Sequence, residues 1–344
     1  MLRVDDASAL EGAQIDGTVV ALPTYVGLVA MVRRLPRLVM SIDRAVRNSD
    51  VTCVKLPGII GLIAVWRAYR RRRPIAAQVV GDIDEVLRTG VAGKVGSMLA
   101  PLAVRLTRRA IRRADTVRYV TEQSLQRKYP AHTGAVRVAY TDVRAEPIAV
   151  PASRVCIPGR IIAVGSQEQL YKGHPVLIEA VAALVRDGID AQLDLVGDGR
   201  RQPELSALVG SLGITGRVRF LGHIDDRPSL LALLDQAEVF AMPSLTEGLP
   251  RALIEAMARG LPCIGSDVGG IPELLPRVAL VPPGDVVALT RRLRRVLTDP
   301  SFQADLAAAA IESAERFKPE ALERRRQIWS ASVGALVSGR GSGS

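Results

Sequence analysis

The alternation of short apolar runs with amphipathic helical patterns constrains the fold of this 344-residue chain more than any other feature. Runs such as 51–56, 160–165 and 239–242 are rich in apolar residues and are bounded by Gly, Pro or polar residues, which is typical of short buried strands. Strands that are apolar along their whole length and are separated by helices indicate parallel sheets covered on both faces. We therefore predict an α/β fold.

The length of the chain predicts two domains of ordinary size, which meet near the prolines at 151–158. Two parallel sheets that face each other across a cleft bind ligands at the carboxyl ends of their strands, so we expect the functional residues in the turns that follow strands. The predicted parts are an N-terminal domain at 1–152, a C-terminal domain at 153–317, a helix at 318–338 that packs back toward the N-terminal domain, and a flexible tail at 339–344.

Positive charge is concentrated in the N-terminal half. Residues 1–150 hold 24 Lys and Arg against 13 Asp and Glu, whereas the remaining residues hold 22 of each. Two of the arginine pairs, Arg108-Arg109 and Arg112-Arg113, have a spacing that would place them on one helix face. Two interpretations stay open: a solvated arginine-rich surface, or docking of this half on an anionic membrane. Nucleic acid is not an expected partner, because aromatic side chains do not interleave the arginines.

No segment of the sequence is predicted to cross a membrane. The longest apolar run, 56–66, has about half of the roughly 20 residues that span a bilayer, and residues 1–17 lack the pattern of a signal peptide. We therefore expect a cytoplasmic protein, peripheral at the inner face of the plasma membrane if the basic half docks there. The 3 Cys and 3 His are scattered, so a disulfide framework, a zinc site and a catalytic triad are not expected.

Two glutamates eight residues apart, Glu247 and Glu255, follow the strand predicted at 239–242. Glu247 lies in the turn at the carboxyl end of that strand, and Glu255 lies about one turn into the next helix, which Pro250 is suited to begin. The free N–H groups of such a helix start form an anion site. The same spacing in the charged terminal helices is expected to mark only solvated faces, at Glu312/Glu320 and Glu315/Glu323.

The segment Ser244-Leu-Thr-Glu247-Gly-Leu-Pro-Arg-Ala-Leu-Ile-Glu255, followed by Gly269-Gly270-Ile-Pro-Glu273, resembles the nucleotide-sugar-binding signature of family-4 retaining glycosyltransferases. Three upstream segments are similar to those of the family in order and interval: Val164-Gly165-Ser166 with Tyr171-Lys172-Gly173, Leu195-Val-Gly197-Asp198-Gly199, and Phe220-Leu221-Gly222. The resemblance covers residues 160–285 strongly and the first half weakly. It implies the GT-B architecture, in which two Rossmann-like parallel-sheet domains face a central cleft.

The resemblance also implies roles for individual residues. Glu255 would hold the ribose hydroxyls of the donor nucleotide, Glu247 would accept hydrogen bonds from the donor sugar, and Lys172 would bind the diphosphate as the bond to the leaving nucleotide breaks. Many family members have an arginine where this chain has Ser166, so either Lys172 acts alone or Arg251 assists it. The other donor-binding positions implied are the amides of Gly248 and Leu249, the turn residue Gly197, and Leu221 with His223 near the base.

The first half departs from the family pattern. About five strands are predicted there (18–22, 51–56, 74–81, 115–121 and 136–140), and residues 1–17 contain neither the first strand nor the glycine-rich turn of the family. The N-terminal domain is therefore expected to lack its first βαβ portion. The loop at 80–84 resembles a family segment at the cleft, and it makes Asp82 a candidate catalytic residue, although turn chemistry explains Asp82 equally well.

The resemblance implies a glycosyltransferase of the hexosyltransferase type, which transfers a sugar with retention from a UDP- or GDP-sugar to a lipid-linked or polysaccharide acceptor. No carboxylate is expected to act as a covalent nucleophile, in contrast to the two-carboxylate glycosidases. No metal and no other cofactor is expected. The alternative function is that of a truncated, inactive nucleotide-sugar-binding relative, or of one half of a split enzyme. The base, the sugar, the acceptor and the linkage are left open.

Overall fold

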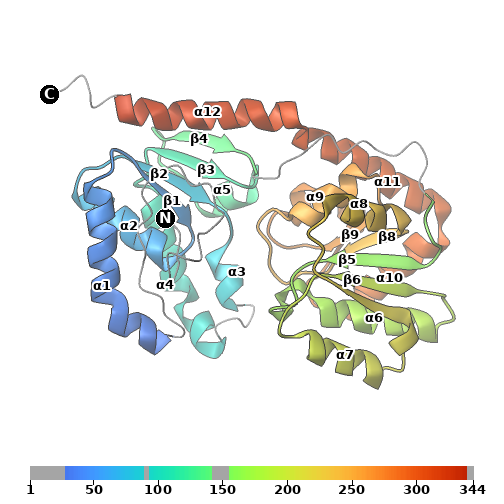
Figure 1. Ribbon diagram of the computed structural model, residues 1–344. Helices are drawn as coiled ribbons and strands as arrows, with labels where there is room; N and C mark the ends of the chain where they lie inside the picture. Colours follow the sequence, from blue (N-terminus) through green and yellow to red (C-terminus); the bar gives the residue numbers. More distant parts are fainter. Residues whose placement is uncertain (1–27, 89–92, 142–154, 339–344) are drawn as a thin grey trace.

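The computed structural model describes residues 28–88, 93–141 and 155–338. Figure 1 shows two α/β domains side by side, with one long helix running from the C-terminal domain across the N-terminal domain. The strand predicted at 18–22, residues 151–154 of the predicted domain boundary, and the tail at 339–344 lie outside the described residues. The predicted α/β fold with parallel sheets is confirmed.

The N-terminal domain contains a parallel sheet of four described strands in the order β1-β2-β3-β4. The strands are four or five residues long, and β2 and β3 are buried along nearly their whole length. Its elements are α1 (Leu28–Arg47), β1 (Thr52–Leu56), α2 (Ile59–Arg70), β2 (Ile75–Val79), α3 (Ile83–Arg88), α4 (Gly93–Ile111), β3 (Thr116–Tyr119), α5 (Ser124–Lys128) and β4 (Val136–Ala139).

Helix α4 ends earlier than the arginine spacing suggests. Ile111 is the last residue of the helix, but the backbone N–H of Arg112 still donates to the Arg108 carbonyl at 3.0 Å, so Arg112 continues the helical turn. The N–H of Arg113 donates to the Ala110 carbonyl at 3.1 Å, which is a tighter turn. The Arg113 guanidinium instead lies over the ring of Tyr69, 4.0 Å from its centre. The predicted helical spacing is therefore kept by Arg108 and Arg112, whereas Arg113 departs from it.

The C-terminal domain contains a parallel six-stranded sheet in the order β10-β9-β8-β5-β6-β7. From β5 the strands follow the chain order toward one edge of the sheet (β5-β6-β7), and from β8 they follow it toward the other edge (β8-β9-β10). The direction of the strand order therefore reverses between β5 and β8, which is called the reversal point below. The elements are β5 (Arg160–Val164), α6 (His174–Arg186), β6 (Gln192–Val196), α7 (Gln202–Ser211), β7 (Val218–Gly222), α8 (Arg227–Gln236), β8 (Val239–Met242), α9 (Arg251–Ala258), β9 (Cys263–Ser266), β10 (Leu280–Val281), α10 (Val286–Thr298) and α11 (Pro300–Ala314).

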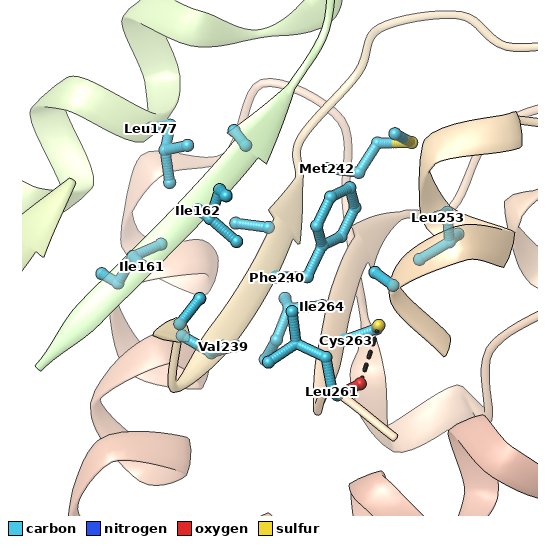
Figure 2. Close-up of a cluster of buried hydrophobic side chains, with 14 of the residues drawn as sticks. Ile161, Ile162, Leu177, Val239, Phe240, Met242, Leu253, Leu261, Cys263 and Ile264 are labelled. Atoms are coloured by element: carbon cyan, nitrogen blue, oxygen red, sulfur yellow. Dashed lines mark hydrogen bonds between the residues drawn. The ribbon is translucent and has the colours of Figure 1, made fainter. Parts of the chain in front are cut away.

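The central strands of this sheet pack between helices on both faces. Figure 2 shows Ile161 and Ile162 on β5, Phe240 on β8 and Ile264 on β9 among side chains of the flanking helices. These four side chains are fully buried. Truncation of one such aromatic or aliphatic side chain to alanine costs about 2–5 kcal/mol, so this core holds the turns at the ends of β5 and β8 in fixed positions.

Helix α12 (Pro319–Ser338) connects the C-terminal domain back to the N-terminal one. It packs against β3 and β4, and the Ser332 hydroxyl lies 3.0 Å from the hydroxyl of Thr116 on β3. This is the placement that the sequence analysis expects for residues 318–338. In the ranges that the structure describes, no helix combines the length and the apolar character needed to span a bilayer.

Candidate active site

A cavity of about 720 Å³ opens at the carboxyl ends of the strands in the C-terminal domain. It lies at the reversal point between β5 and β8, where a doubly wound sheet places its ligand. Its lining comes from the turns after β5, β6, β7 and β8 and from the start of α9, and consists of Val164, Gly165, Ser166, Tyr171, Lys172, Val196, Gly197, Asp198, His223, Ile224, Leu230, Met242, Glu247, Leu249, Pro250, Arg251, Ala252 and Glu255.

Lys172 and Glu247 form an ion pair in this cavity. The Lys172 Nζ lies 2.7 Å from the Glu247 Oε1, and the two side chains are 18% and 8% exposed. The buried Ser244 hydroxyl donates a second hydrogen bond, 2.8 Å long, to the same oxygen. A cation and a carboxylate are thus held in contact where both still face the cavity, and a polar ligand can bind to either.

Local backbone geometry brings these two residues together. Lys172 ends a short 3-10 helix (Leu170–Lys172), and Gly173 after it is left-handed, with φ 74°. A Cβ on Gly173 would collide with the carbonyl oxygen of Pro243, so only glycine allows this approach to the turn after β8. The backbone N–H of Leu245 donates a 2.7 Å hydrogen bond to the Tyr171 carbonyl. The turns after β5 and β8 are therefore joined directly.

Glu255 reaches the cavity from α9, whose first residue is Arg251. Burial raises the pKa of the Glu255 carboxyl, and the charges of Arg227 and Arg251 act in the opposite direction. No side chain caps the N-terminus of α9, so its first backbone N–H groups are available to an anion. Three carboxylates (Asp198, Glu247 and Glu255), one lysine and one helix start share the cavity.

Most residues predicted for the site line this cavity. Besides Lys172, Glu247 and Glu255, these are Ser166, Gly197, His223, Leu249 and Arg251. Leu221 and Gly248 are not among the lining residues. A Cβ on Gly248 would collide with the carbonyl oxygen of Val80, so this glycine lies where the two domains touch.

Asp82 is placed away from the cavity. It is 4% exposed, its carboxylate accepts a 2.5 Å hydrogen bond from the Tyr129 hydroxyl, and it also pairs with Lys128. The backbone N–H of Asp84 donates to Asp82 as well, at 2.9 Å. These contacts fit the turn chemistry that the sequence analysis left open for Asp82, and the structure does not bring the residue into the cavity.

Glu85, which the sequence analysis did not single out, makes the contact from this loop to the C-terminal domain. Its carboxylate accepts hydrogen bonds from the Thr246 hydroxyl at 3.0 Å and from the backbone N–H of Gly269 at 3.3 Å. Burial raises the pKa of Glu85, and the negative charge of Asp82 adds to this shift. Thr246 precedes Glu247, so Glu85 stabilises the turn that contains Glu247 of the ion pair.

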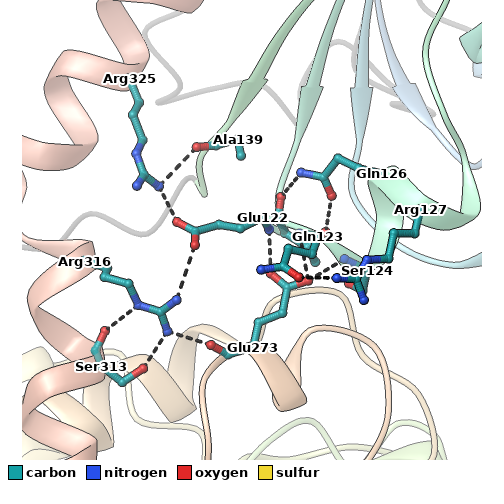
Figure 3. Close-up of polar contacts among 11 residues, drawn as sticks. Glu122, Gln123, Ser124, Gln126, Arg127, Ala139, Glu273, Ser313, Arg316 and Arg325 are labelled. Carbon is teal, nitrogen blue, oxygen red and sulfur yellow. Dashed lines mark hydrogen bonds and ion pairs between the residues drawn. The ribbon is translucent and has the colours of Figure 1, made fainter.

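A second contact between the domains surrounds Glu273, shown in Figure 3. The Glu273 carboxylate accepts hydrogen bonds from the backbone N–H groups of Glu122, Gln123 and Ser124 at 2.5, 3.1 and 2.6 Å. The Glu122 carboxylate pairs in turn with Arg316 at 3.3 Å and with Arg325 of α12 at 2.8 Å. Glu273 thus has a structural role between the domains, which its place in the sequence motif did not reveal.

The fold defines the structural class of the protein: two parallel-sheet domains, with a polar cavity at the reversal point of the second, are the GT-B arrangement. The solved structure of Anabaena Alr3699/HepE in complex with UDP has the same fold, with a TM-score of 0.67 and 20% identity over 96% of this chain and 88% of that one. Within the described residues, no group of three or more His, Cys, Asp or Glu side chains could hold a metal ion.

The sequence comparisons identify a known domain in the C-terminal half of the chain. Residues 158–299 match the model described as "Glycosyl transferases group 1". It is 28% identical over 261 residues to Protein CapJ of Staphylococcus aureus, covering 75% of this chain and 66% of CapJ. It is also 29% identical to 2-deoxystreptamine glucosyltransferase of Streptomyces kanamyceticus, over 88% of this chain and 89% of that protein.

Proposed function

We propose that this chain is a retaining glycosyltransferase that transfers a sugar from a nucleotide-diphosphate sugar to a lipid-linked or polysaccharide acceptor. The observation that carries the proposal is the presence of the Lys172–Glu247 pair and of Glu255 in one cavity at the reversal point of the C-terminal sheet. A cation for phosphates and two carboxylates for hydroxyls are the groups that such a donor requires.

In this proposal the donor nucleotide lies along the start of α9. The Glu255 carboxylate accepts hydrogen bonds from the two ribose hydroxyls, each worth about 1.5–3 kcal/mol when the acceptor is ionised. The diphosphate lies against the first N–H groups of α9 and near Arg251. The base lies toward His223, and we expect uracil or guanine there.

The chemical step depends on how charge is arranged at the diphosphate. As the bond between the sugar and the diphosphate breaks, negative charge grows on the leaving oxygen, and the Lys172 ammonium stabilises it. Glu247 accepts hydrogen bonds from the sugar hydroxyls and keeps Lys172 in place. No side chain in this scheme forms a covalent bond to the sugar. Because Lys172, Arg251 and the helix start balance the diphosphate, we expect chelation of divalent metals to leave the rate unchanged.

Calorimetric titration with UDP, GDP and ADP tests the proposal, with Glu255→Gln as the main variant. The variant keeps the size of the side chain but loses the charge, so we expect the affinity for the preferred nucleotide to fall by about 10- to 100-fold. Glu312→Gln is the matched control, because Glu312 begins a pair with the same eight-residue spacing but lies exposed on α11. We expect the control to bind like the wild type.

The pH dependence of binding provides an independent check. Ribose hydroxyls donate to ionised Glu255, whose pKa in the free protein is raised by burial. Binding should therefore weaken as the pH falls through that raised pKa, and Glu255→Gln should lack this component. Equal affinities and equal pH profiles for both proteins would contradict the donor site. Tight nucleotide binding without any release of nucleotide diphosphate from a UDP- or GDP-sugar would instead favour the alternative of a binding protein without turnover.

A further inference from the structure

Helix α4 exposes more large apolar side chains than any other element that the structure describes. Val95, Met98, Leu99, Leu102 and Leu106, here called the α4 stripe, include side chains with 59%, 82% and 55% exposure at Val95, Met98 and Leu102. Their spacing of i, i+3, i+4, i+7 and i+11 places them along one face of the helix. The opposite face is buried, with Ala100 and Ile111 fully enclosed. The helix is thus apolar on the side that solvent reaches.

Arginines flank the α4 stripe on one side. Arg105 and Arg109 each follow a stripe leucine by three residues, so they lie next to Leu102 and Leu106 on the helix surface. Both are exposed, and within the described ranges of the chain neither has a carboxylate partner. The sequence of α4 contains no Asp or Glu. An apolar strip beside uncompensated positive charge is the pattern of a helix that lies in the interface of an anionic bilayer.

The position of α4 relates this surface to the cleft. α4 packs along α3, and α3 carries Glu85, which binds the turn before Glu247 in the C-terminal domain. A bilayer in contact with α4 would therefore lie against the N-terminal domain, which faces the donor cavity. A lipid-linked acceptor would enter between this domain and the cavity.

We infer that the α4 stripe, with Arg105 and Arg109, docks the protein on an anionic lipid bilayer, with the apolar side chains among the acyl chains and the guanidiniums at lipid phosphates. A second copy of the chain fits this surface less well, because it would bring together two halves that each carry 24 basic against 13 acidic residues. The inference rests on the proposed function only for the lipid-linked acceptor; docking itself is independent of catalysis.

Flotation with vesicles tests the inference on the full-length protein. We expect binding to vesicles of phosphatidylcholine mixed with phosphatidylglycerol and little binding to phosphatidylcholine alone. Arg105→Gln with Arg109→Gln should weaken binding to the anionic vesicles by about 30-fold, as each cation near the lipid contributes about 1 kcal/mol. Leu102→Ser with Leu106→Ser should weaken it at least as much, because both side chains lose their apolar contact with the lipid.

Matched controls remove the same types of side chain from other surfaces of the protein. Arg291→Gln with Arg324→Gln removes two exposed arginines from α10 and α12, and Val278→Ser with Val287→Ser removes two exposed apolar side chains from the C-terminal domain. We expect both controls to bind vesicles like the wild type. All variants should keep the nucleotide affinity of the wild type, which shows that they fold and separates this test from that of the donor site.

Three results would overturn the inference: equal binding of the wild type to neutral and anionic vesicles, unchanged binding of both α4 variants, or a dimer in light scattering that becomes a monomer in Leu102→Ser with Leu106→Ser. The last result would assign the α4 stripe to contact between copies of the chain. Vesicle binding that is lost in the α4 variants would support the inference even if no nucleotide bound.

Discussion

The two domains share one architecture but use charge in opposite ways. In the C-terminal domain the charges at the cavity are largely enclosed and paired: Lys172 contacts Glu247, and Glu255 lies in the field of Arg227 and Arg251. In the N-terminal half the excess charge is basic, and on α4 it stands exposed beside an apolar strip. Enclosed, balanced charges can be positioned for a small polar ligand, whereas exposed, unbalanced charges suit an extended anionic surface.

The difference also concerns how each charge is held. A buried carboxylate that loses its cationic partner keeps the full desolvation cost of a buried charge. An exposed arginine contributes little to the stability of the protein, so a change at its partner has a small effect. Substitutions of the same type in the two domains should therefore have very different effects, and the first two of the following predictions use such matched pairs.

The largest effect is expected for Lys172→Met, which removes the cation at the proposed diphosphate site and leaves Glu247 enclosed without it. Release of nucleotide diphosphate from the sugar donor should fall by about 100- to 1000-fold, the usual consequence of losing one group that stabilises a leaving oxyanion. The measurement is the initial rate of nucleotide release at a saturating donor concentration.

The matched control is Lys55→Met on β1, an exposed lysine of the N-terminal domain. It should leave the rate within about twofold of the wild type, as expected for a surface substitution. If Lys172→Met retained the wild-type rate and a wild-type melting temperature, the ion pair would have no part in turnover.

Substitution of His174, at the start of α6, is expected to have an intermediate effect, on the pH dependence of the unfolding free energy. Burial, together with the charge of Lys172, lowers the pKa of His174 to about 4. A free histidine has a pKa of about 6.5, so between pH 7 and pH 5 the unfolded chain gains a proton that the folded domain does not. Stability is therefore lost as the pH falls, by about 2 kcal/mol over this interval.

His174→Gln should flatten the dependence of the unfolding free energy on pH between 7 and 5 by this amount, measured by urea denaturation at several pH values. His132→Gln is the control, because His132 is exposed in the N-terminal domain, and its profile should follow that of the wild type. Identical slopes for wild type and His174→Gln would show that His174 titrates normally in the folded protein.

The smallest effect is expected where the two domains meet. Glu273→Ala removes the acceptor of three backbone N–H groups at the start of α5. These groups are partly exposed and can turn to water, so the loss should be only about 1 kcal/mol. It would appear as a small decrease in the midpoint of thermal unfolding, with nucleotide affinity unchanged. A large loss of nucleotide affinity would mean that this contact also shapes the donor cavity.

Much of the fold follows from local sequence patterns. The apolar runs at 51–56, 160–165 and 239–242 correspond to β1, β5 and β8, because strands covered on both faces are largely apolar. The end of α4 was harder to place, since Arg112 and Arg113 continue its basic pattern while the chain leaves the helix at Ile111. After Ile111 the backbone tightens, with the Arg113 N–H donating to Ala110 and the Ala114 N–H donating to Ile111, a local change that the charge pattern does not indicate.

The site was predictable where it is local in sequence. Glu247 and Glu255 belong to one turn and the helix after it, and the resemblance to a family supplied Lys172. Glu85 and Glu273 acquire their roles from partners far away in the chain, and no spacing rule marks them. Asp82 is the opposite case. Its position in the loop at 80–84 made it a candidate catalytic residue, but in the structure its carboxylate is hydrogen-bonded to Lys128 and Tyr129.

The central claim is that the C-terminal cavity holds the nucleotide half of the donor. A crystal structure with the preferred nucleotide diphosphate tests it most directly. The account predicts both ribose hydroxyls at hydrogen-bond distance, about 2.6–3.0 Å, from the Glu255 carboxylate, with the diphosphate between Lys172 and the start of α9. A nucleotide bound elsewhere, or bound in this cavity with the Glu255 carboxylate turned away from the ribose, would contradict the account.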